Sequence, residues 1–100
     1  MTKHHTSEQD VKVAVDAVIF SIKESKLSIL LIQMKKKPFE KSWALPGGLI
    51  EENETTLEAA TRILKMQTSM TDVFLEQLAT FDDIDRDPAG RVLSVAHYAL

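Results

Sequence analysis

The residues best suited to chemistry lie in one stretch, residues 47–70, which reads GGLIEENETTLEAATRILKMQTSM. It opens with two glycines and a group of glutamates, as a loop that grips a metal ion and a diphosphate would. The helix that follows places Ile63, Met66 and Gln67 at positions i, i+3 and i+4, and such positions project from one helix face. Magnesium prefers charged oxygen ligands, which an isoleucine, a soft thioether and a neutral carboxamide do not supply. The sequence therefore predicts neither a metal site nor a catalytic base on this face.

One helix must carry this face, and the sequence marks where it begins. Thr55 is followed three residues later by Glu58, a capping box in which each side chain bonds the backbone N–H of the other residue. We predict a helix over residues 55–69 with two apolar stripes. The first stripe, expected to face the core, contains Leu57, Ala60 and Leu64. The second, interpreted as extra packing or a contact surface, contains Ala59, Ile63, Met66 and Met70.

Four other stretches predict strands. They cover residues 11–22, 27–34, 73–82 and 91–100. The first alternates at period two and is expected to bury one face, made by Val11, Val13, Val15, Ala17 and Ile19. The second, LSILLIQM, is apolar on both faces, so we expect it to be buried on both sides and to form a hairpin with the first through KESK. ALPGG predicts a tight turn before the helix. This order of elements predicts an α/β (α+β) fold in which helices pack on a mixed sheet.

Composition is that of an ordinary globular domain. The 100 residues are 44% hydrophobic and 27% charged, with a net charge of −3, and are enough for one domain. The basic run Lys35 to Lys37 is too short for a nucleic-acid surface, so this chain is not expected to bind nucleic acid alone. The absence of cysteine excludes disulfides and fits a cytoplasmic protein. Residues 1–10 are predicted to be a disordered leader, and no apolar run is long enough to cross a membrane.

Residues 43–62, WALPGGLIEENETTLEAATR, resemble the Nudix box of the Nudix hydrolases, which cleave nucleoside diphosphates linked to another group. The remnants of the box are Gly47, Gly48, Glu54 and Arg62. The resemblance implies a Nudix-type α/β/α sandwich around a mixed sheet over residues 11–100, incomplete at its C-terminal end. In this setting Arg62 is expected to pair with Glu54, and Gly48 to supply the backbone freedom of the turn.

The second half of the box departs from the family pattern. Ile63 stands where the family has a glutamate, Met66 and Gln67 replace a glutamate pair, and Ser69 replaces a glycine. In the family these carboxylates bind magnesium and help to activate water. Because these carboxylates act together, their absence should abolish metal-assisted hydrolysis. We therefore expect no catalytic residues and no cofactor.

Residues 81–100, FDDIDRDPAGRVLSVAHYAL, resemble the segment after the Nudix helix in a bacterial subgroup that includes transcriptional regulators of NAD-related and sugar metabolism. In those proteins a Nudix-like domain, often catalytically degraded, senses ADP-ribose or a related nucleotide sugar, and a C-terminal winged helix binds DNA. The resemblance implies that this chain is the sensing domain. DNA would then be bound only through a C-terminal domain outside these 100 residues.

Two arginines of this segment are the predicted phosphate partners, with Gly48 as a third ligand-binding residue. Arg86 and Arg91 each carry a guanidinium, which can hold two diphosphate oxygens at once. For Arg86 an ion pair with Asp85 or Asp87 in a solvated loop is an equal alternative.

Two further functions remain open. In the first, an active hydrolase uses magnesium and recruits carboxylates from Glu51, Glu52 and Glu54. In the second, the domain only mediates interactions, and the second stripe of the helix serves dimerisation. One helix covers one side of a sheet whose strand 27–34 is apolar on both, so we expect the uncovered face or edge to meet a second copy, which would form a homodimer, or a further part of the same protein.

Overall fold

The computed structural model describes residues 10–35, 37, 40–84 and 90–99. Its elements are β1 (Val11–Lys23), β2 (Lys26–Ile29), β3 (Ile32–Gln33), β4 (Trp43–Ala44), β5 (Gly47–Leu49), α1 (Thr56–Thr68), β6 (Glu76–Phe81) and β7 (Arg91–Ala99). The predictions for residues 1–9 of the leader, for Arg86 and its aspartate neighbours, and for Leu100 lie outside the described residues.

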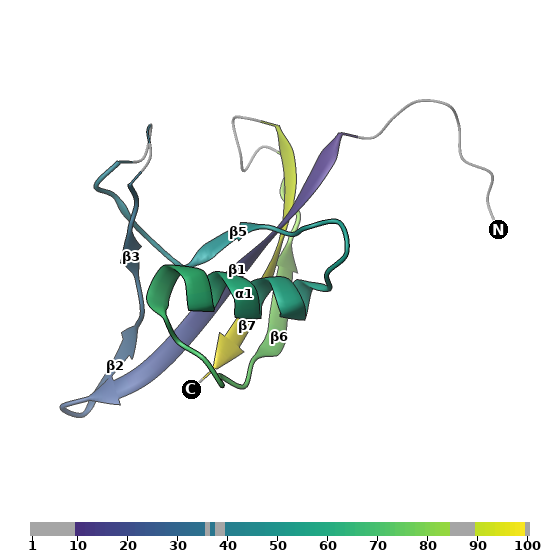
Figure 1. The fold of residues 1–100 in the computed structure, drawn as a ribbon. Coiled ribbons are helices and arrows are strands. Elements are labelled where there is room, and N and C mark those ends of the chain that lie inside the picture. The colour runs from purple at the N-terminus through teal and green to yellow at the C-terminus, as the bar shows by residue number, and fades with distance from the viewer. Residues whose placement is uncertain (1–9, 36, 38–39, 85–89, 100) are drawn as a thin grey trace.

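The strands form one mixed sheet and a small separate ladder (Figure 1). The main sheet has the order β2-β1-β7-β6, and β5 also pairs with β1. β1 runs parallel to β7, from Val11 opposite Arg91 to Ile19 opposite Ala99, whereas the other pairings are antiparallel. β3 pairs with β4 in the ladder, with Gln33 opposite Trp43. The mixed sheet agrees with the predicted fold class.

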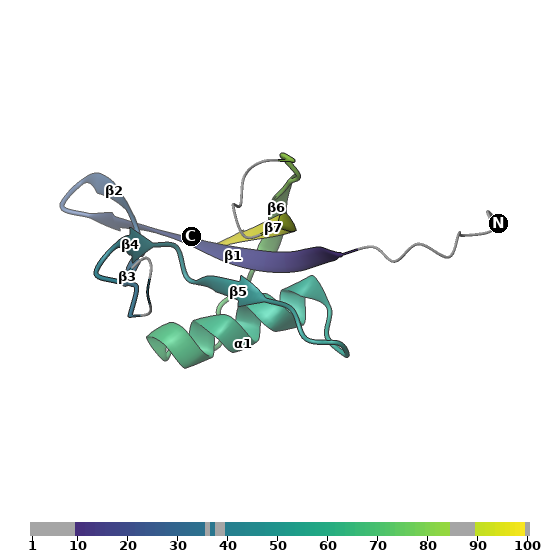
Figure 2. The same ribbon diagram turned by 90° about the horizontal axis from the view of Figure 1, so that it is seen from above.

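The core lies between α1 and one face of β1 and β7, as Figure 2 shows from above. Alternation in β1 buries Val15, Ala17 and Ile19 on this side, so the predicted face is confirmed in the middle of the strand. Val11, at the start of β1, is 43% exposed instead. Small residues let the helix approach the sheet closely: Ala59 and Ala60 are fully buried.

The helix begins where the capping box predicted. Thr55 is the N-cap; its hydroxyl accepts from the Glu58 N–H, and the Glu58 carboxylate accepts from the Thr55 N–H. The helix ends at a C-cap, Ser69, in the left-handed conformation. Ala60 and Leu64 of the first stripe are buried as expected, but Leu57 is 47% exposed, because it lies in the first turn beyond the edge of the core.

The prediction of one strand over 27–34 that is buried on both sides is wrong. The segment contains two short strands, β2 and β3, which pair with different partners. Leu27 is 67% exposed and Ile29 is 48% exposed, because among the described residues β2 pairs with β1 alone and no element packs on it. An apolar run indicates that a segment suits a strand, but not whether other elements cover it.

Other boundaries differ less. The KESK hairpin is confirmed, with Glu24 and Ser25 in the left-handed region that a tight two-residue turn requires. The strand predicted from residue 73 begins at Glu76, and Leu75 packs into the core ahead of it. The ALPGG turn is a bend at Pro46 followed directly by β5. Within the described part of the chain, no helix has the length and apolar character needed to cross a membrane.

Replacing Leu64 by alanine tests the core between helix and sheet. Leu64 is 1% exposed, so the variant leaves a cavity and should lose ~2–5 kcal/mol of folding free energy. The control is Leu57→Ala on the same helix, which removes the same atoms from a half-exposed site and should lose ~1 kcal/mol or less. Urea denaturation followed by circular dichroism measures both. Equal losses would show that the helix packs on the sheet differently.

Candidate functional site

An arginine–glutamate pair closes the loop between β5 and α1. Arg62 Nε lies 3.0 Å from Glu54 Oε2, and Arg62 Nη2 lies 2.6 Å from Glu54 Oε1. Nη2 also donates to the backbone carbonyl of Leu49 at 3.1 Å. Glu54 in turn accepts from the Glu51 N–H at 2.8 Å. The predicted pairing of Glu54 with Arg62 is confirmed, and its bidentate geometry is the strong form of this contact.

The pair shifts the titration of both groups. The Arg62 hydrogen bond holds the pKa of Glu54 below its ordinary value of 4.5, although desolvation acts in the opposite direction. The bond to Glu54 raises the pKa of Arg62. Glu54 is therefore a charged structural partner at neutral pH and not a proton acceptor.

Ile63, Met66 and Gln67, on the helix face where the family has carboxylates, lie in three different environments. Ile63 is 3% exposed and belongs to the core. Met66 is 71% exposed, with its sulfur 3.8 Å from Arg62 Nη1. Gln67 makes two hydrogen bonds with Gly47: its Oε1 accepts from the Gly47 N–H at 3.1 Å, and its Nε2 donates to the Gly47 carbonyl at 2.9 Å. In the second stripe, the predicted extra packing is therefore confirmed for Ala59 and Ile63.

Close packing requires a glycine at position 47 and leaves little room for a side chain at position 48. A Cβ on Gly47 would come within 2.5 Å of Asp16 Oδ1 and 2.7 Å of the Val15 carbonyl. A Cβ on Gly48 would lie 3.2 Å from Ile63 Cδ1. Neither glycine has a positive φ, so the expectation that Gly48 supplies backbone freedom for a turn is wrong. Both belong to β5, which lies between β1 and the helix and leaves little space for side chains there.

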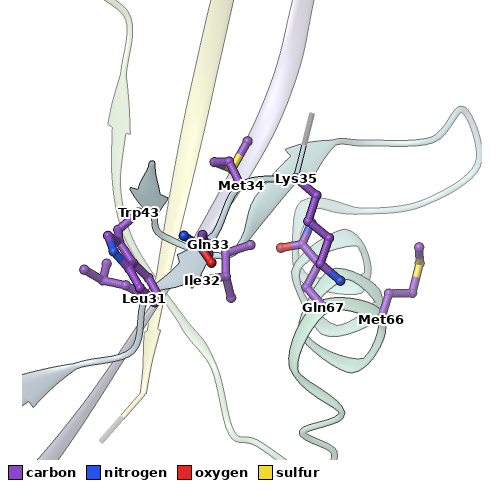
Figure 3. A pocket seen from close by; sticks show the side chains of 8 residues that line it. All are labelled: Leu31, Ile32, Gln33, Met34, Lys35, Trp43, Met66 and Gln67. Atoms are coloured by element: carbon purple, nitrogen blue, oxygen red, sulfur yellow. The ribbon is translucent and has the colours of Figure 1, made fainter. Parts of the chain in front are cut away.

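A cleft of about 530 Å³ opens beside the end of this helix face. It is lined by Leu31, Ile32, Gln33, Met34, Lys35, Trp43, Met66 and Gln67, drawn in Figure 3. The β3–β4 ladder and the segments beside it supply one wall, and the helix supplies the other. Trp43 is 65% exposed, which leaves much of its indole accessible. Apolar side chains with a few polar groups and one cation are typical of a small-molecule site.

Sequence reasoning missed most of this cleft. Residues 35–43, KKKPFEKSW, read as a polar loop of the kind that can border a site, and Lys35 and Trp43 do line the cleft, but nothing in the sequence signalled that Trp43 would lie across from α1. The available signal was loop position, because binding residues are often found in loops held by a rigid scaffold.

The structure does not bring Arg91 to the cleft. Arg91 begins β7 opposite Val11, whereas Gly47 lies opposite Asp16, five residues further along β1. Its Nη2 donates to the Asp82 carbonyl at 3.1 Å, and its buried Nε has no partner among the described residues. Its role as a phosphate partner remains a prediction, as does that of Gly48, which is packed against Ile63. His97, also on β7, is 2% exposed, and burial lowers its pKa.

Sequence comparison assigns the family. The family model described as NUDIX domain matches residues 10–100. The chain belongs to the Nudix family. The position of the helix, the glycine strand and the Arg62–Glu54 pair are thus those of a Nudix box, and the fold expected from the resemblance is confirmed.

Two characterised relatives have different functions. The chain is 38% identical over 90 residues to the ADPR responsive transcriptional repressor NtrR of Acinetobacter baylyi, covering 88% of this chain and 36% of the relative. It is 41% identical over 83 residues to the ADP-ribose pyrophosphatase of Methanocaldococcus jannaschii, covering 83% of this chain and 47% of the relative. The chain therefore spans less than half the length of either protein.

Solved structures similar to this chain include those of a Shewanella oneidensis protein. The Nudix domain of Shewanella oneidensis NrtR, crystallised with ADP ribose, superposes with a TM-score of 0.85 and 34% identity, covering 93% of this chain and 62% of that chain. The same Shewanella protein in complex with a 27mer DNA has a TM-score of 0.77 and 36% identity, covering 88% and 41%. These are properties of the Shewanella protein, and the domain that this chain resembles is the one crystallised with the nucleotide sugar.

The magnesium of the Nudix hydrolases does not fit the residues of this helix face. Ile63 offers no donor, Met66 offers a soft sulfur, and the one oxygen of Gln67 already accepts from Gly47. Among the described residues, no three His, Asp or Glu side chains lie close enough together to hold a metal ion.

The Glu54–Arg62 pair predicts a pH-dependent stability difference between the wild type and Glu54→Gln. The folded pKa of Glu54 is lowered, so the charged pair stabilises the fold above the unfolded pKa, and this contribution is lost as pH falls through the folded value. The wild type should be more stable than the variant near pH 7, and the two should converge as the pH falls below 4.5. Chemical denaturation across this range measures the difference. A difference that persists unchanged in acid would mean that the carboxylate charge contributes nothing.

Proposed function

We propose that this chain is a Nudix domain that senses ADP-ribose, or a related nucleoside-diphosphate sugar, without hydrolysing it, within a transcriptional regulator. The observation that carries the proposal is the state of the catalytic helix face. Ile63 is buried in the core and Gln67 is bonded to Gly47, so two of the three carboxylate positions serve packing and structure.

The cleft supports ligand binding in the absence of this chemistry. Its opening lies beside Gln67 and is flanked by the accessible indole of Trp43 and the ammonium of Lys35. An aromatic face suits a nucleobase, and a cation suits a diphosphate. The relative that responds to ADPR and the Shewanella domain crystallised with ADP ribose support this choice of ligand.

Regulation would need a second domain. The relative that is a repressor is longer than this chain, and the Shewanella protein was crystallised with DNA. We infer that DNA is bound by a domain outside residues 1–100 and that the whole protein acts as a homodimer in the cytoplasm.

An active hydrolase is the second candidate, favoured by the similarity to an ADP-ribose pyrophosphatase. Glu51, Glu52 and Glu54 would have to replace the missing carboxylates. Glu54 is occupied by two hydrogen bonds from Arg62, and Glu51 lies 3.6 Å from the same guanidinium. Of the three, Glu52 alone has no ion pair among the described residues, which argues against a set of three ligands.

The full protein should bind ADP-ribose without cleaving it. Trp43 lies in the cleft wall, so ligand binding should change its fluorescence in the presence of a chelator, measured as the difference between the full protein and its Trp43→Phe variant. With magnesium, AMP and ribose 5-phosphate should stay at background, while the Methanocaldococcus pyrophosphatase serves as the positive control. Product release above background would favour the hydrolase, and absence of both binding and cleavage would favour a module for interactions only.

The predicted phosphate anchors are tested by calorimetry on the same protein. Arg91→Ala and Arg86→Ala should each weaken ADP-ribose binding, by ~1.5–3 kcal/mol for Arg91, since each removes a hydrogen-bonding cation from the diphosphate. Lys65→Ala is the control, because Lys65 is exposed on α1 and does not line the cleft. If neither arginine variant binds more weakly than the control, the diphosphate is held elsewhere.

A further inference from the structure

The outer edge of β5 is completed by side chains of the helix. Among the described residues β5 pairs with β1 alone. The Ala17 N–H donates to the Pro46 carbonyl at 2.9 Å, and the Ile50 N–H donates to the Val13 carbonyl at 3.0 Å. Backbone groups alternate in direction along an antiparallel pair, so Gly47 and Leu49 direct theirs away from β1.

Two side chains of α1 bond to these outward groups. Arg62 donates to the Leu49 carbonyl at 3.1 Å, and Gln67 bonds both the N–H and the carbonyl of Gly47. The spacings match: five residues of helix rise about 7.5 Å, and two residues of strand extend about 6.7 Å. The helix therefore serves β5 as a neighbouring strand would, with Arg62 and Gln67 in place of peptide groups.

Only a carboxamide can make the Gln67 contact in full. It presents one donor and one acceptor, as a peptide group does, and both are used on the same residue. A carboxylate has no donor for the Gly47 carbonyl and would place one of its charged oxygens against it. Gly47 must also lack a side chain, because a Cβ would meet Asp16 and Val15. The contact therefore requires a carboxamide at position 67 and a glycine at position 47.

The same two residues stand at the wall of the cleft. Gln67 lines the cleft together with Ile32 and Lys35, which Figure 3 shows beside its carboxamide. Two residues separate Gly47 from the end of β4, and β4 contains Trp43. Fixing Gly47 to α1 therefore fixes the distance between the helix wall and the Trp43 wall.

We propose that Gln67 is a positioning residue of the ligand cleft, which holds Gly47 and the β4–β5 connection against α1 through its paired donor and acceptor. This inference rests on the proposed function for the identity of the ligand, but not for the contact itself. At this position the contact and the family's carboxylate exclude each other, because the contact requires a neutral donor that a carboxylate lacks.

The test compares Gln67→Met, which keeps length but removes both hydrogen bonds, with Gln67→Glu, which keeps the acceptor alone. Gln77→Met and Gln77→Glu are the controls, because Gln77 is an exposed glutamine on β6 that does not line the cleft. Amide hydrogen exchange of Gly47 is measured by NMR in the full protein without ligand. We expect exchange to be roughly tenfold faster in Gln67→Met, less accelerated in Gln67→Glu because the carboxylate still accepts from the Gly47 N–H, and unchanged in the controls.

The second readout is the ADP-ribose affinity, followed by Trp43 fluorescence at a temperature well below the melting point of every variant. Both Gln67 variants should bind roughly tenfold more weakly, and the emission maximum of Trp43 should shift before ligand is added. Unchanged exchange at Gly47, or faster exchange with unchanged affinity, would overturn the positioning role. If the wild type fails to bind ADP-ribose, the proposed function is wrong, and the Gly47 exchange and the Trp43 emission without ligand decide whether Gln67 positions the wall.

Discussion

The attachment of β5 to α1 is the constraint on which the site depends. β5 is three residues long, with two glycines that contribute no side-chain packing. Its position is set on one side by the ladder with β1 and on the other by Arg62 and Gln67. Because the strand lies so close to both neighbours, a side chain on Gly47 would collide with the Val15 backbone, and one on Gly48 would press on the end of the Ile63 side chain. The loop, the helix and the cleft wall are therefore placed as one unit.

This arrangement explains how a Nudix box can keep its structure with Ile63, Met66 and Gln67 at positions where the family has carboxylates. Each remnant of the box has a structural role. Gly47 lies against Asp16 and Val15, and Gly48 lies against Ile63. Glu54 and Arg62 pair with each other. None of these contacts needs a metal ion. Two residues that depart from the family pattern also contribute to this structure. Ile63 packs in the core, and Gln67 forms a hydrogen bond with β5. The box is thus a folding unit as well as a catalytic one, and the first role does not require the second.

The relatives show that this fold accompanies two functions, a repressor that responds to ADPR and a pyrophosphatase. Overall similarity does not separate them, since the identities are 38% and 41%. What bears on the choice for this chain is the absence of carboxylates at Ile63, Met66 and Gln67 and the environment of each residue. Here a fold-level comparison identifies the family, and the chemistry of the individual side chains favours sensing over hydrolysis.

The sequence by itself determined the local features. The capping box, the alternation of β1, the Glu54–Arg62 spacing and the three non-carboxylate residues could all be read directly, because each depends on residues close together in the chain or on a fixed helical period. Only the tertiary structure decided the rest. It showed that the apolar segment 27–34 is divided between two partners, that Gly47 and Gly48 belong to a strand, and that Trp43 faces the end of α1 across a cleft. These features depend on contacts between segments far apart in the sequence. A local residue pattern does not indicate which distant segment will pack against it.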